Sequence, residues 1–443
     1  MSSIHEIPEV AGLDGNVGSI RIPPEIDVPM TRRVRALVDT REFRRLSEIS
    51  QLGLVALVYP AANHTRFEHS LGVYRLALCY LRRLASDPRF TDVVKKEDGE
   101  LLLVAALLHD LGHWPFCHPI EDIQLPSVPR HELFANSFLL ESEIADVIRD
   151  DWEINPRDVV SLLSEKPRDR AHRILSTMLS GPVDIDKMDY LRRDSLHAGV
   201  PYGNNFDQNR LIGSLCLNEK GDGLALTQKG KTAAEMMVFA RYVMFSEVYW
   251  HHSVRGATAM LQRAFCQICG SLDLDTLFRT SESGMITELL STAGDSGAGE
   301  LLSGLFGPSR RLYKRLAEYS IFHDRDIYTR LARKPYPYLI ACAERFADLA
   351  SPHLGRRISP HEVLFDAPPV SREVEFNVEV HDTKTDCYRR LGDVSPVVRA
   401  LAERQFDDYV KRVRIFAHPS IVEDLREMSD LNRIVSDAID AVD

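Results

Sequence analysis

The feature that most constrains the fold is the segment ALLHDLGHWPFCHPIED, residues 106–122, in which an apolar run ends in an adjacent histidine and aspartate. Burying imidazole and carboxylate groups beside Leu107 and Leu108 costs several kcal/mol unless these groups are paired or bind a metal ion. Gly112 and Pro115 interrupt the helix, so we expect the histidines that follow to lie on a turn and a loop that face one cavity. The fold must therefore bring further polar residues to this point.

Two distant segments offer such residues. Residues 64–73, HTRFEHSLGV, lead into a long amphipathic helix and place His69 near the start of its inward face. In residues 184–194, DIDKMDYLRRD, three polar side chains spaced four apart share one helix face. These three are Asp186, Tyr190 and Asp194. Lys187 and Arg193 flank that face and can offer positive charge to phosphate oxygens.

Apolar residues recur at helical spacing over most of residues 1–270, which predicts an almost entirely helical body. Two short apolar runs around a Gly-Asp-Gly turn in residues 211–228 predict a small β-hairpin. We expect one long helix to follow, from about Lys231 through Cys269. Residues 291–300, STAGDSGAGE, are typical of a mobile loop or linker.

The last third of the chain has a different pattern. Residues 372–380, REVEFNVEV, alternate apolar and polar side chains, which predicts a half-buried strand. A second strand is expected at residues 412–418, RVRIFAH. The predicted fold class is therefore mainly α, a helical bundle with a small β-hairpin, plus a smaller C-terminal α+β region.

Composition excludes several classes of protein. The 443 residues are 44% hydrophobic, as in a globular protein, and contain neither an apolar run long enough to span a membrane nor a signal peptide. The seven cysteines are an odd, scattered set that favours reduced thiols, so we expect a cytoplasmic protein. The net charge of -11 argues against extended nucleic-acid binding, while a small anionic ligand would need locally concentrated cations.

These motifs resemble the HD superfamily, whose pattern is a single histidine, an adjacent His-Asp pair and a later aspartate. Within it, residues from about Ser19 to about 270 are most similar to the deoxynucleoside triphosphate triphosphohydrolases that carry a sterile-alpha-motif domain in animals, and to their bacterial relatives. That extra domain does not fit into the short N-terminus. The resemblance implies four parts: an N-terminal arm over 1–30, an HD phosphohydrolase core over 31–270, a helical segment with a flexible Gly/Ser loop over 271–330, and the C-terminal α+β region over 331–443.

The resemblance implies that four residues hold a divalent metal ion. They are His69, His109, Asp110 and Asp186. This mixed nitrogen and oxygen set suits Mn, Fe, Co, Ni or Zn, with Mg also possible, and does not choose between them.

Further roles follow from the same resemblance. The residues matching His118 and Glu121 assist the attack of water and the departure of the leaving group. His131 and Glu132 match another active-site pair, or alternatively only orient the metal ligands. The expected substrate contacts are phosphate at Arg66 and Lys187, deoxyribose at Tyr190 and Asp194, sugar and base at Gln51 and Leu52, and a further contact at His113.

Some positions depart from the family pattern. The animal enzymes complete the triphosphate and base pocket with an arginine and a histidine, where this chain has Ser246 and Trp250. Tyr249, Trp250 and His251 either stack on a base or bind phosphate, or they are aromatic core. Among positions linked to nucleotide regulation, Asp39 and Arg45 are kept, but Arg44 and Ser47 differ, so a nucleotide effector stays an open alternative. A homo-oligomer is expected by analogy.

The leading functional hypothesis is hydrolysis of a deoxynucleoside triphosphate (dNTP) to a deoxynucleoside and inorganic triphosphate. An HD phosphatase, phosphodiesterase or nuclease acting on other nucleotides is the enzymatic alternative, although the acidic net charge disfavours long nucleic acids. A nucleotide-sensing scaffold is the non-enzymatic alternative, and the complete set of metal-binding residues argues against it.

Overall fold

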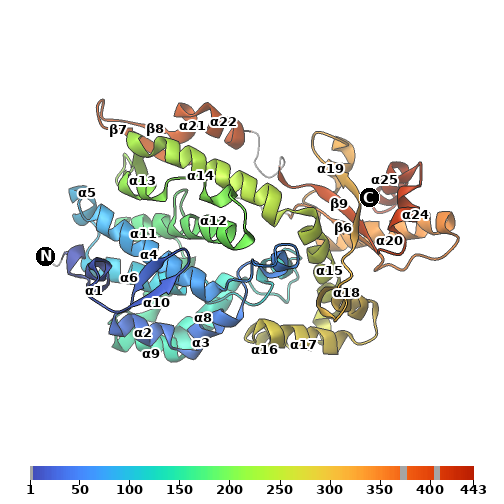
Figure 1. Cartoon of the computed structure of the whole chain (residues 1–443), viewed down its shortest axis with the longest axis horizontal. Coiled ribbons are helices and arrows are strands. Elements are labelled where there is room, and N and C mark those ends of the chain that lie inside the picture. Colours follow the sequence, from blue (N-terminus) through green and yellow to red (C-terminus); the bar gives the residue numbers. More distant parts are fainter. Residues whose placement is uncertain (1–2, 370–376, 404–409) are drawn as a thin grey trace.

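The computed structural model describes residues 3–369, 377–403 and 410–443. A helical body occupies the N-terminal part of the chain, and a smaller unit that contains the C-terminus lies at one end of it (Figure 1). The helices that build the body are α2 (Arg32–Val38), α3 (Arg41–Arg45), α4 (Arg66–Leu84), α6 (Lys96–Leu108), α7 (Cys117–Glu121), α8 (His131–Glu141), α9 (Glu143–Asp150), α10 (Pro156–Ser164), α11 (Arg170–Ser180), α12 (Ile185–Ala198), α13 (Gln208–Gly213), α14 (Lys231–Met244) and α15 (His252–Ile268).

Helix α4 lies between α6 and α12 and forms the centre of the body. It begins at Thr65, whose side chain accepts a hydrogen bond from the backbone N–H of Glu68, and it buries a leucine-rich face. Helix α6 is buried along almost its whole length, which agrees with its continuous apolar sequence. Helix α12 begins at Asp184, whose carboxylate accepts a 2.7 Å bond from the Lys187 N–H.

One glycine allows α4 and α12 to approach closely. A Cβ atom at Gly72 would lie 1.9 Å from Oδ1 of Asp189 and 2.3 Å from Nη2 of Arg193. No side chain larger than a hydrogen atom therefore fits at this position without displacing an ion pair of α12.

Three small sheets accompany the helices. Strands β1 (Ser19–Ile22) and β2 (Ile26–Pro29) pair antiparallel in the N-terminal arm, a hairpin that we did not predict. The predicted hairpin over 211–228 is confirmed as β3 (Leu215–Leu217) and β4 (Leu224–Thr227). Strand β4 also pairs in parallel with β7 (Glu379–Asp382), which pairs with β8 (Cys387–Arg390).

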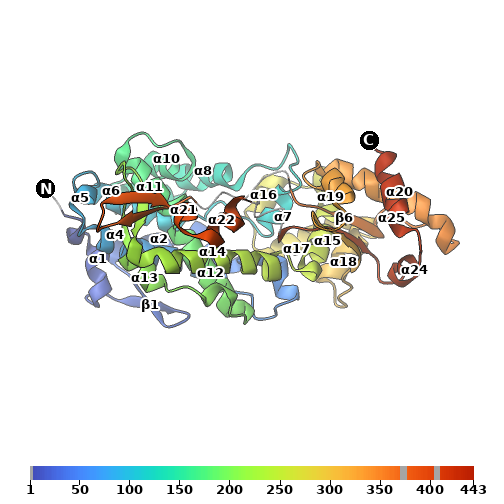
Figure 2. The same cartoon turned by 90° about the horizontal axis from the view of Figure 1, so that it is seen from above.

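The C-terminal unit has its own apolar core. Its sheet has the order β5 (Lys314–Tyr319), β9 (Val413–Ala417), β6 (Val363–Asp366), and β9 confirms the strand expected over 412–418. The helices of this unit are α19 (Arg325–Leu331), α20 (Tyr336–Leu354), α24 (Val422–Arg426) and α25 (Leu431–Asp440). Figure 2 shows α20, α24 and α25 gathered at this end, around the sheet.

Residues 378–398 belong to the other core. Val378, Val380, Leu391 and Val398 pack into the hydrophobic core of the helical body, together with the short helices α21 (Leu391–Val394) and α22 (Pro396–Glu403). The stretch over 331–443 that we expected to form one region is thus shared between two cores. The proposed strand over 372–380 lies mostly outside the described residues, although its last two residues open β7.

Two helical expectations need correction. The helix expected over 231–269 is divided: α14 ends at Met244, a π-helical turn spans Phe245–Tyr249, and α15 begins at His252. The loop expected over 291–300 is mostly helical, because α17 (Glu282–Ala293) and α18 (Gly297–Phe306) leave only three residues between them.

The remaining helices are α1 (Pro8–Ala11), α5 (Pro88–Thr91) and α16 (Leu274–Phe278). None of the described helices combines the length and the apolar character that a membrane span requires.

Candidate metal and catalytic site

Three segments that lie far apart in the sequence bring metal-binding atoms together. His69 comes from the first turn of α4, His109 directly follows α6, and Asp186 lies in the first turn of α12. Nε2 of His69 lies 3.3 Å from Nε2 of His109 and 3.1 Å from Oδ1 of Asp186. The possible ligand atoms of these three residues all lie within 4.8 Å of one another.

Asp110 lies beside this cluster. Its Oδ1 is 3.4 Å from Nε2 of His109, and its Oδ2 is 3.9 Å from Nε2 of His69. The same Oδ2 accepts a 2.7 Å bond from Nη1 of Arg66. The structure therefore brings together all four residues that the resemblance assigned to the metal.

The two imidazoles are oriented as metal ligands require. Nδ1 of His69 lies 2.8 Å from Oδ2 of Asp189, and Nδ1 of His109 lies 2.9 Å from the carbonyl oxygen of Ala106. These acceptors retain the proton on Nδ1 and leave the Nε2 lone pairs facing each other. In the metal-free protein a proton on Nε2 of His69, 3.1 Å from Oδ1 of Asp186, relieves the repulsion between these atoms, and a divalent metal ion would take the place of that proton, so the donor set fits such an ion.

The electrostatics of the cluster also favour a bound cation. Burial opposes protonation of His69, but hydrogen bonds to Asp186 and Asp189 outweigh it and raise the pKa of His69 to about 10. Burial likewise opposes ionisation of Asp110, yet the neighbouring cationic groups hold the pKa of its carboxyl well below the usual value. The chain thus has a candidate divalent metal centre whose carboxylates stay ionised.

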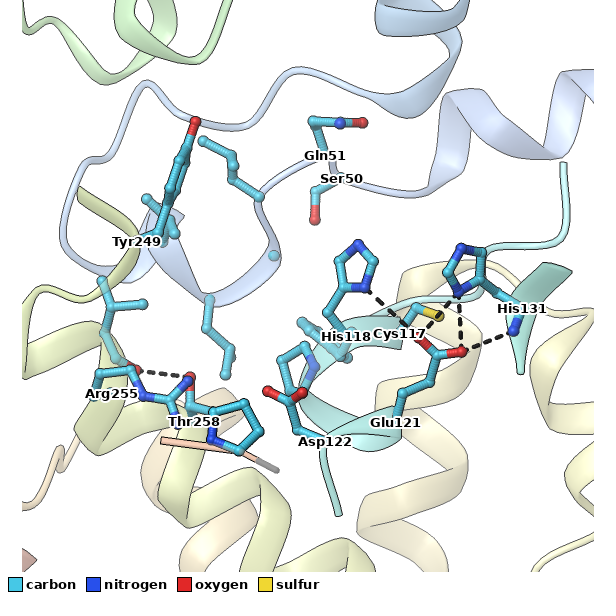
Figure 3. A pocket seen from close by; sticks show the side chains of 18 of the residues that line it. Ser50, Gln51, Cys117, His118, Glu121, Asp122, His131, Tyr249, Arg255 and Thr258 are labelled. Atoms are coloured by element: carbon cyan, nitrogen blue, oxygen red, sulfur yellow. Dashed lines mark hydrogen bonds and ion pairs between the residues drawn. The ribbon is translucent and has the colours of Figure 1, made fainter. Parts of the chain in front are cut away.

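A second polar group surrounds Glu121 on α7 (Figure 3). Its Oε1 accepts a 2.7 Å bond from the backbone N–H of His131, and both of its oxygens lie 3.0 Å from Nδ1 of that histidine. Nδ1 of His118 lies 3.6 Å from Oε2. Burial would raise the pKa of Glu121, but the hydrogen bonds to His118 and His131 outweigh it and hold the pKa well below the usual range. A permanent negative charge therefore lies between two imidazoles.

A cavity of about 840 Å³ lies beside the Glu121 group, and none of the four proposed metal ligands is among the described residues that line it. Of the eleven residues that the resemblance assigned to catalysis or substrate binding, eight line it: Gln51, Leu52, Arg66, His118, Glu121, His131, Tyr190 and Asp194. The His118 side chain is 62% exposed and stands at the cavity. The cavity adjoins the metal cluster, because Arg66 both lines it and donates to Asp110.

Three other residues named from sequence lie elsewhere, since they are not among the described residues that line the cavity. His113 is buried against Asp110, with its ring centre 4.0 Å from that of His131, and burial lowers its pKa well below the usual value. Glu132 lies 3.7 Å from Nδ1 of His131. The Lys187 ammonium is 2.5 Å from Oδ2 of Asp184. A substrate or catalytic role for these three stays a prediction.

The aromatic segment after α14 contributes to the wall. The Tyr249 hydroxyl donates a 2.6 Å bond to Oδ2 of Asp194, whose Oδ1 lies 2.9 Å from Nε2 of His64. Tyr249 and Trp250 both line the cavity, although the sequence left aromatic core packing open as an alternative for them. The tyrosine spacing alone does not distinguish a buried core ring from one that borders a cavity.

Arg45 acts within the fold. Its buried guanidinium donates to the carbonyl oxygens of Leu111 and His113 at 2.7 and 2.9 Å, and it lies over the Phe138 ring. It therefore holds the turn that follows the His-Asp pair, which is a different role from the effector contact that we considered.

The sequence reasoning missed Arg255 and Lys411, which also line the cavity. Arg255 lies on α15 and Lys411 lies just before β9. Nothing in their local sequence marks them, and Lys411 reaches the cavity only through the packing of the C-terminal unit.

Comparisons with known proteins give consistent findings. Residues 66–194 match the family described as HD domain, and residues 206–431 match the one described as HD associated region. An uncharacterised protein of Methanocaldococcus jannaschii is 29% identical over 416 residues, which cover 92% of this chain and 81% of that protein. The crystal structure of a hypothetical protein from Aquifex aeolicus superposes with a TM-score of 0.71 at 27% identity, covering 93% of this chain and 99% of that one.

Several of the similar proteins have a named activity. The deoxynucleoside triphosphate triphosphohydrolase SAMHD1 of Gallus gallus is 28% identical over 260 residues, which cover 52% of this chain and 42% of that protein. Other curated relatives are also matched over about half of their own length, 50% and 52% in two cases.

Proposed function

The chain belongs to the family of HD-domain proteins that carry an HD-associated region, and from this premise we propose that it hydrolyses dNTPs to a deoxynucleoside and inorganic triphosphate. The observation that carries the proposal is the cavity. It places an acid–base group, Glu121 with two histidines, and a polar wall of α12 around one space beside the His-Asp cluster. The similarity to a triphosphohydrolase over half of the chain supports this substrate class.

His69, His109, Asp110 and Asp186 would hold the metal. A divalent ion bound there would polarise a phosphoryl oxygen and lower the pKa of water. The candidates remain Mn, Fe, Mg, Co, Ni and Zn, because nitrogen and carboxylate donors accept all of them.

His118 is placed to handle a proton. Its imidazole is exposed to the cavity, and its Nδ1 lies 3.6 Å from Oε2 of the ionised Glu121. In the proposed reaction water adds to the α-phosphorus, the bond between that phosphorus and the sugar oxygen breaks, and His118 donates a proton to the departing oxygen. His131, fixed by Glu121 through its ring and its backbone, maintains the position of that carboxylate.

The side of the cavity formed by α12 provides a basis for selecting deoxyribose over ribose. Asp194 is held by His64 and by Tyr249, so its carboxylate has a fixed position from which it can accept a bond from a sugar hydroxyl. Tyr190 lines the cavity one turn away on the same helix face, between Asp194 and Asp186. A phenol ring in this place would leave no room for a 2′-hydroxyl group.

The test is a product analysis. Purified protein is incubated with each of the four dNTPs, with matched ribonucleotides and with several divalent metals, and the products are separated by ion-exchange chromatography. Release of a deoxynucleoside and intact triphosphate supports the proposal. Release of pyrophosphate or of single phosphate contradicts it and favours another HD phosphatase or phosphodiesterase activity. Asp186→Ala and His109→Ala should each remove both bound metal and turnover.

A further inference from the structure

Cationic side chains line the cavity although the chain carries a net charge of -11, and they share the described lining with three acidic side chains. Four cationic side chains line it: Arg66, Arg130, Arg255 and Lys411. The first belongs to the metal cluster through Asp110, and the second is adjacent in sequence to His131. The other two stand on a wall that no motif and no comparison assigns.

Arg255 is a preorganised donor. It is only 7% exposed, its Nε and Nη2 donate to the two oxygens of Asp366 at 3.1 and 2.5 Å, and its guanidinium lies 4.0 Å from the centre of the Trp250 ring. Its Nη1 makes no hydrogen bond to any of the described residues. The ion pair with Asp366 and the Trp250 indole thus hold the Arg255 guanidinium in one orientation, and the two N–H groups of its Nη1 are left for a ligand.

Lys411 reaches the same place from the C-terminal unit. It is 5% exposed, and its ammonium lies 5.8 Å from the centre of the same Trp250 ring. The Trp250 Nε1–H donates to the carbonyl oxygen of Arg412 at 3.3 Å, and Arg414 donates to the Trp250 carbonyl at 2.7 Å. The hydrogen bonds of Trp250 to Arg412 and Arg414 therefore hold the segment that contains Lys411 beside the cavity.

Two of the acids near this wall are already paired with arginines. Asp366 is engaged with Arg255, and Glu318 with Arg414. Asp122 also lines the cavity, but burial raises the pKa of its carboxyl despite the neighbouring cations. In Figure 3 Asp122 lies between His118 and the wall that bears Arg255 and Thr258. An anion placed on this wall would meet buried cations in a region of low dielectric constant.

We propose that Arg255 and Lys411 bind the β- and γ-phosphates of the substrate, so that the HD-associated region completes the polyphosphate subsite of the cavity. This inference rests on the proposed function and specifies which residues recognise its substrate. It explains how the cavity binds a polyphosphate although Ser246 and Trp250 stand where the similar animal enzymes have an arginine and a histidine.

The experiment measures binding of inorganic tripolyphosphate by isothermal titration calorimetry, with the whole chain both metal-loaded and chelator-treated. Lys411→Gln should raise the Kd about tenfold or more, because a charge-assisted contact is lost, and it should reduce the salt dependence of binding. Arg255→Lys keeps a charge for the buried Asp366 while it removes the guanidinium, and should also weaken binding. Lys384→Gln, on an exposed turn, is the matched control and should bind like the natural protein.

The outcomes separate this inference from the proposed function. If tripolyphosphate binds equally well to the Lys411 and Arg255 variants, the inference is wrong, whatever the enzyme hydrolyses. If the variants change only the preference among the four bases, the wall recognises the base and the inference is also wrong. If the protein releases no triphosphate from a dNTP, yet both variants lose tripolyphosphate affinity, the subsite stands and the proposed reaction fails. If Arg255→Lys does not fold, Lys411→Gln decides alone.

Discussion

Replacing Asp189 by asparagine should weaken metal binding by about ten- to hundredfold while the helices keep their places. The carboxylate accepts from Nδ1 of His69 at 2.8 Å and from Nε and Nη2 of Arg193 at 2.7 Å each. Asparagine keeps the side-chain volume and one oxygen acceptor. It removes the negative charge that increases the basicity of the His69 imidazole and so strengthens the bond from Nε2 to the metal. Arg193 then retains only Glu68 as its ionic partner.

The expected loss corresponds to about 1.4–2.7 kcal/mol of metal-binding free energy. It would be measured by competition with a chelator at buffered free metal, with bound metal counted by mass spectrometry. Turnover at saturating metal should recover in large part, because the ligand atoms themselves are unchanged. A loss of turnover with unchanged metal affinity would refute the orienting role.

Glu68→Gln is the matched control. The Glu68 carboxylate contacts the same Arg193 and also His197, but in the described structure it makes no hydrogen bond or ion pair with the His69 side chain. This variant should therefore bind the metal nearly as tightly as the natural protein. If it weakened metal binding as much as Asp189→Asn does, general loosening of the buried charge network would explain both results, and the specific argument about His69 would be wrong.

Three further predictions follow from the packing and the charges. Gly72→Ala should lower stability by about 1–3 kcal/mol or more and release metal, because its Cβ would displace Asp189; an unchanged melting temperature would contradict this. Arg45→Met should lower the free energy of unfolding, measured with a denaturant, by about 1–3 kcal/mol, since the carbonyls of Leu111 and His113 lose their donor. An Arg45→Met variant as stable as the natural protein would show that water replaces this donor. The pKa of Glu121 is depressed below its usual value of 4.5, so this carboxylate stabilises the fold above pH 4.5, and that stabilisation is lost as the pH falls below 4.5. The free energy of unfolding of Glu121→Gln should therefore depend less on acid pH than that of the natural protein. Parallel pH profiles for the two proteins would count against the ion pairs with the histidines.

Patterns with a local cause could be predicted from the sequence. The Gly-Asp-Gly turn between apolar runs predicted the β3–β4 hairpin, and the strand expected over residues 412–418 is confirmed as β9. The density of histidines and acids after α6 identified the residues that the structure gathers around His69 and His109. In these cases the information lies within a few residues, or within motifs that keep their order along the chain.

Features set by distant packing could not be predicted. The helix break at Trp250 has no proline or glycine, and apolar spacing continues on both sides, so the periodicity indicated one helix. The break arises where Trp250 contacts Arg255 and the segment before β9. Lys411 is far in sequence from the other described residues that line the cavity. Only the tertiary fold shows that it lies at the cavity wall.

The parallel pairing of β4 with β7 makes the two halves of the molecule hard to separate. After the helical body, the chain forms β5 and β6 in the second core. It then returns to the first core, where β7 and β8 extend the β3–β4 hairpin, and it finally adds β9 to the sheet of the second core. A fragment that stopped after α15 would keep the β3–β4 pair but leave the other edge of β4 without its partner β7, and it would expose apolar side chains that β7 helps to cover. The two cores are therefore expected to melt in a single cooperative transition.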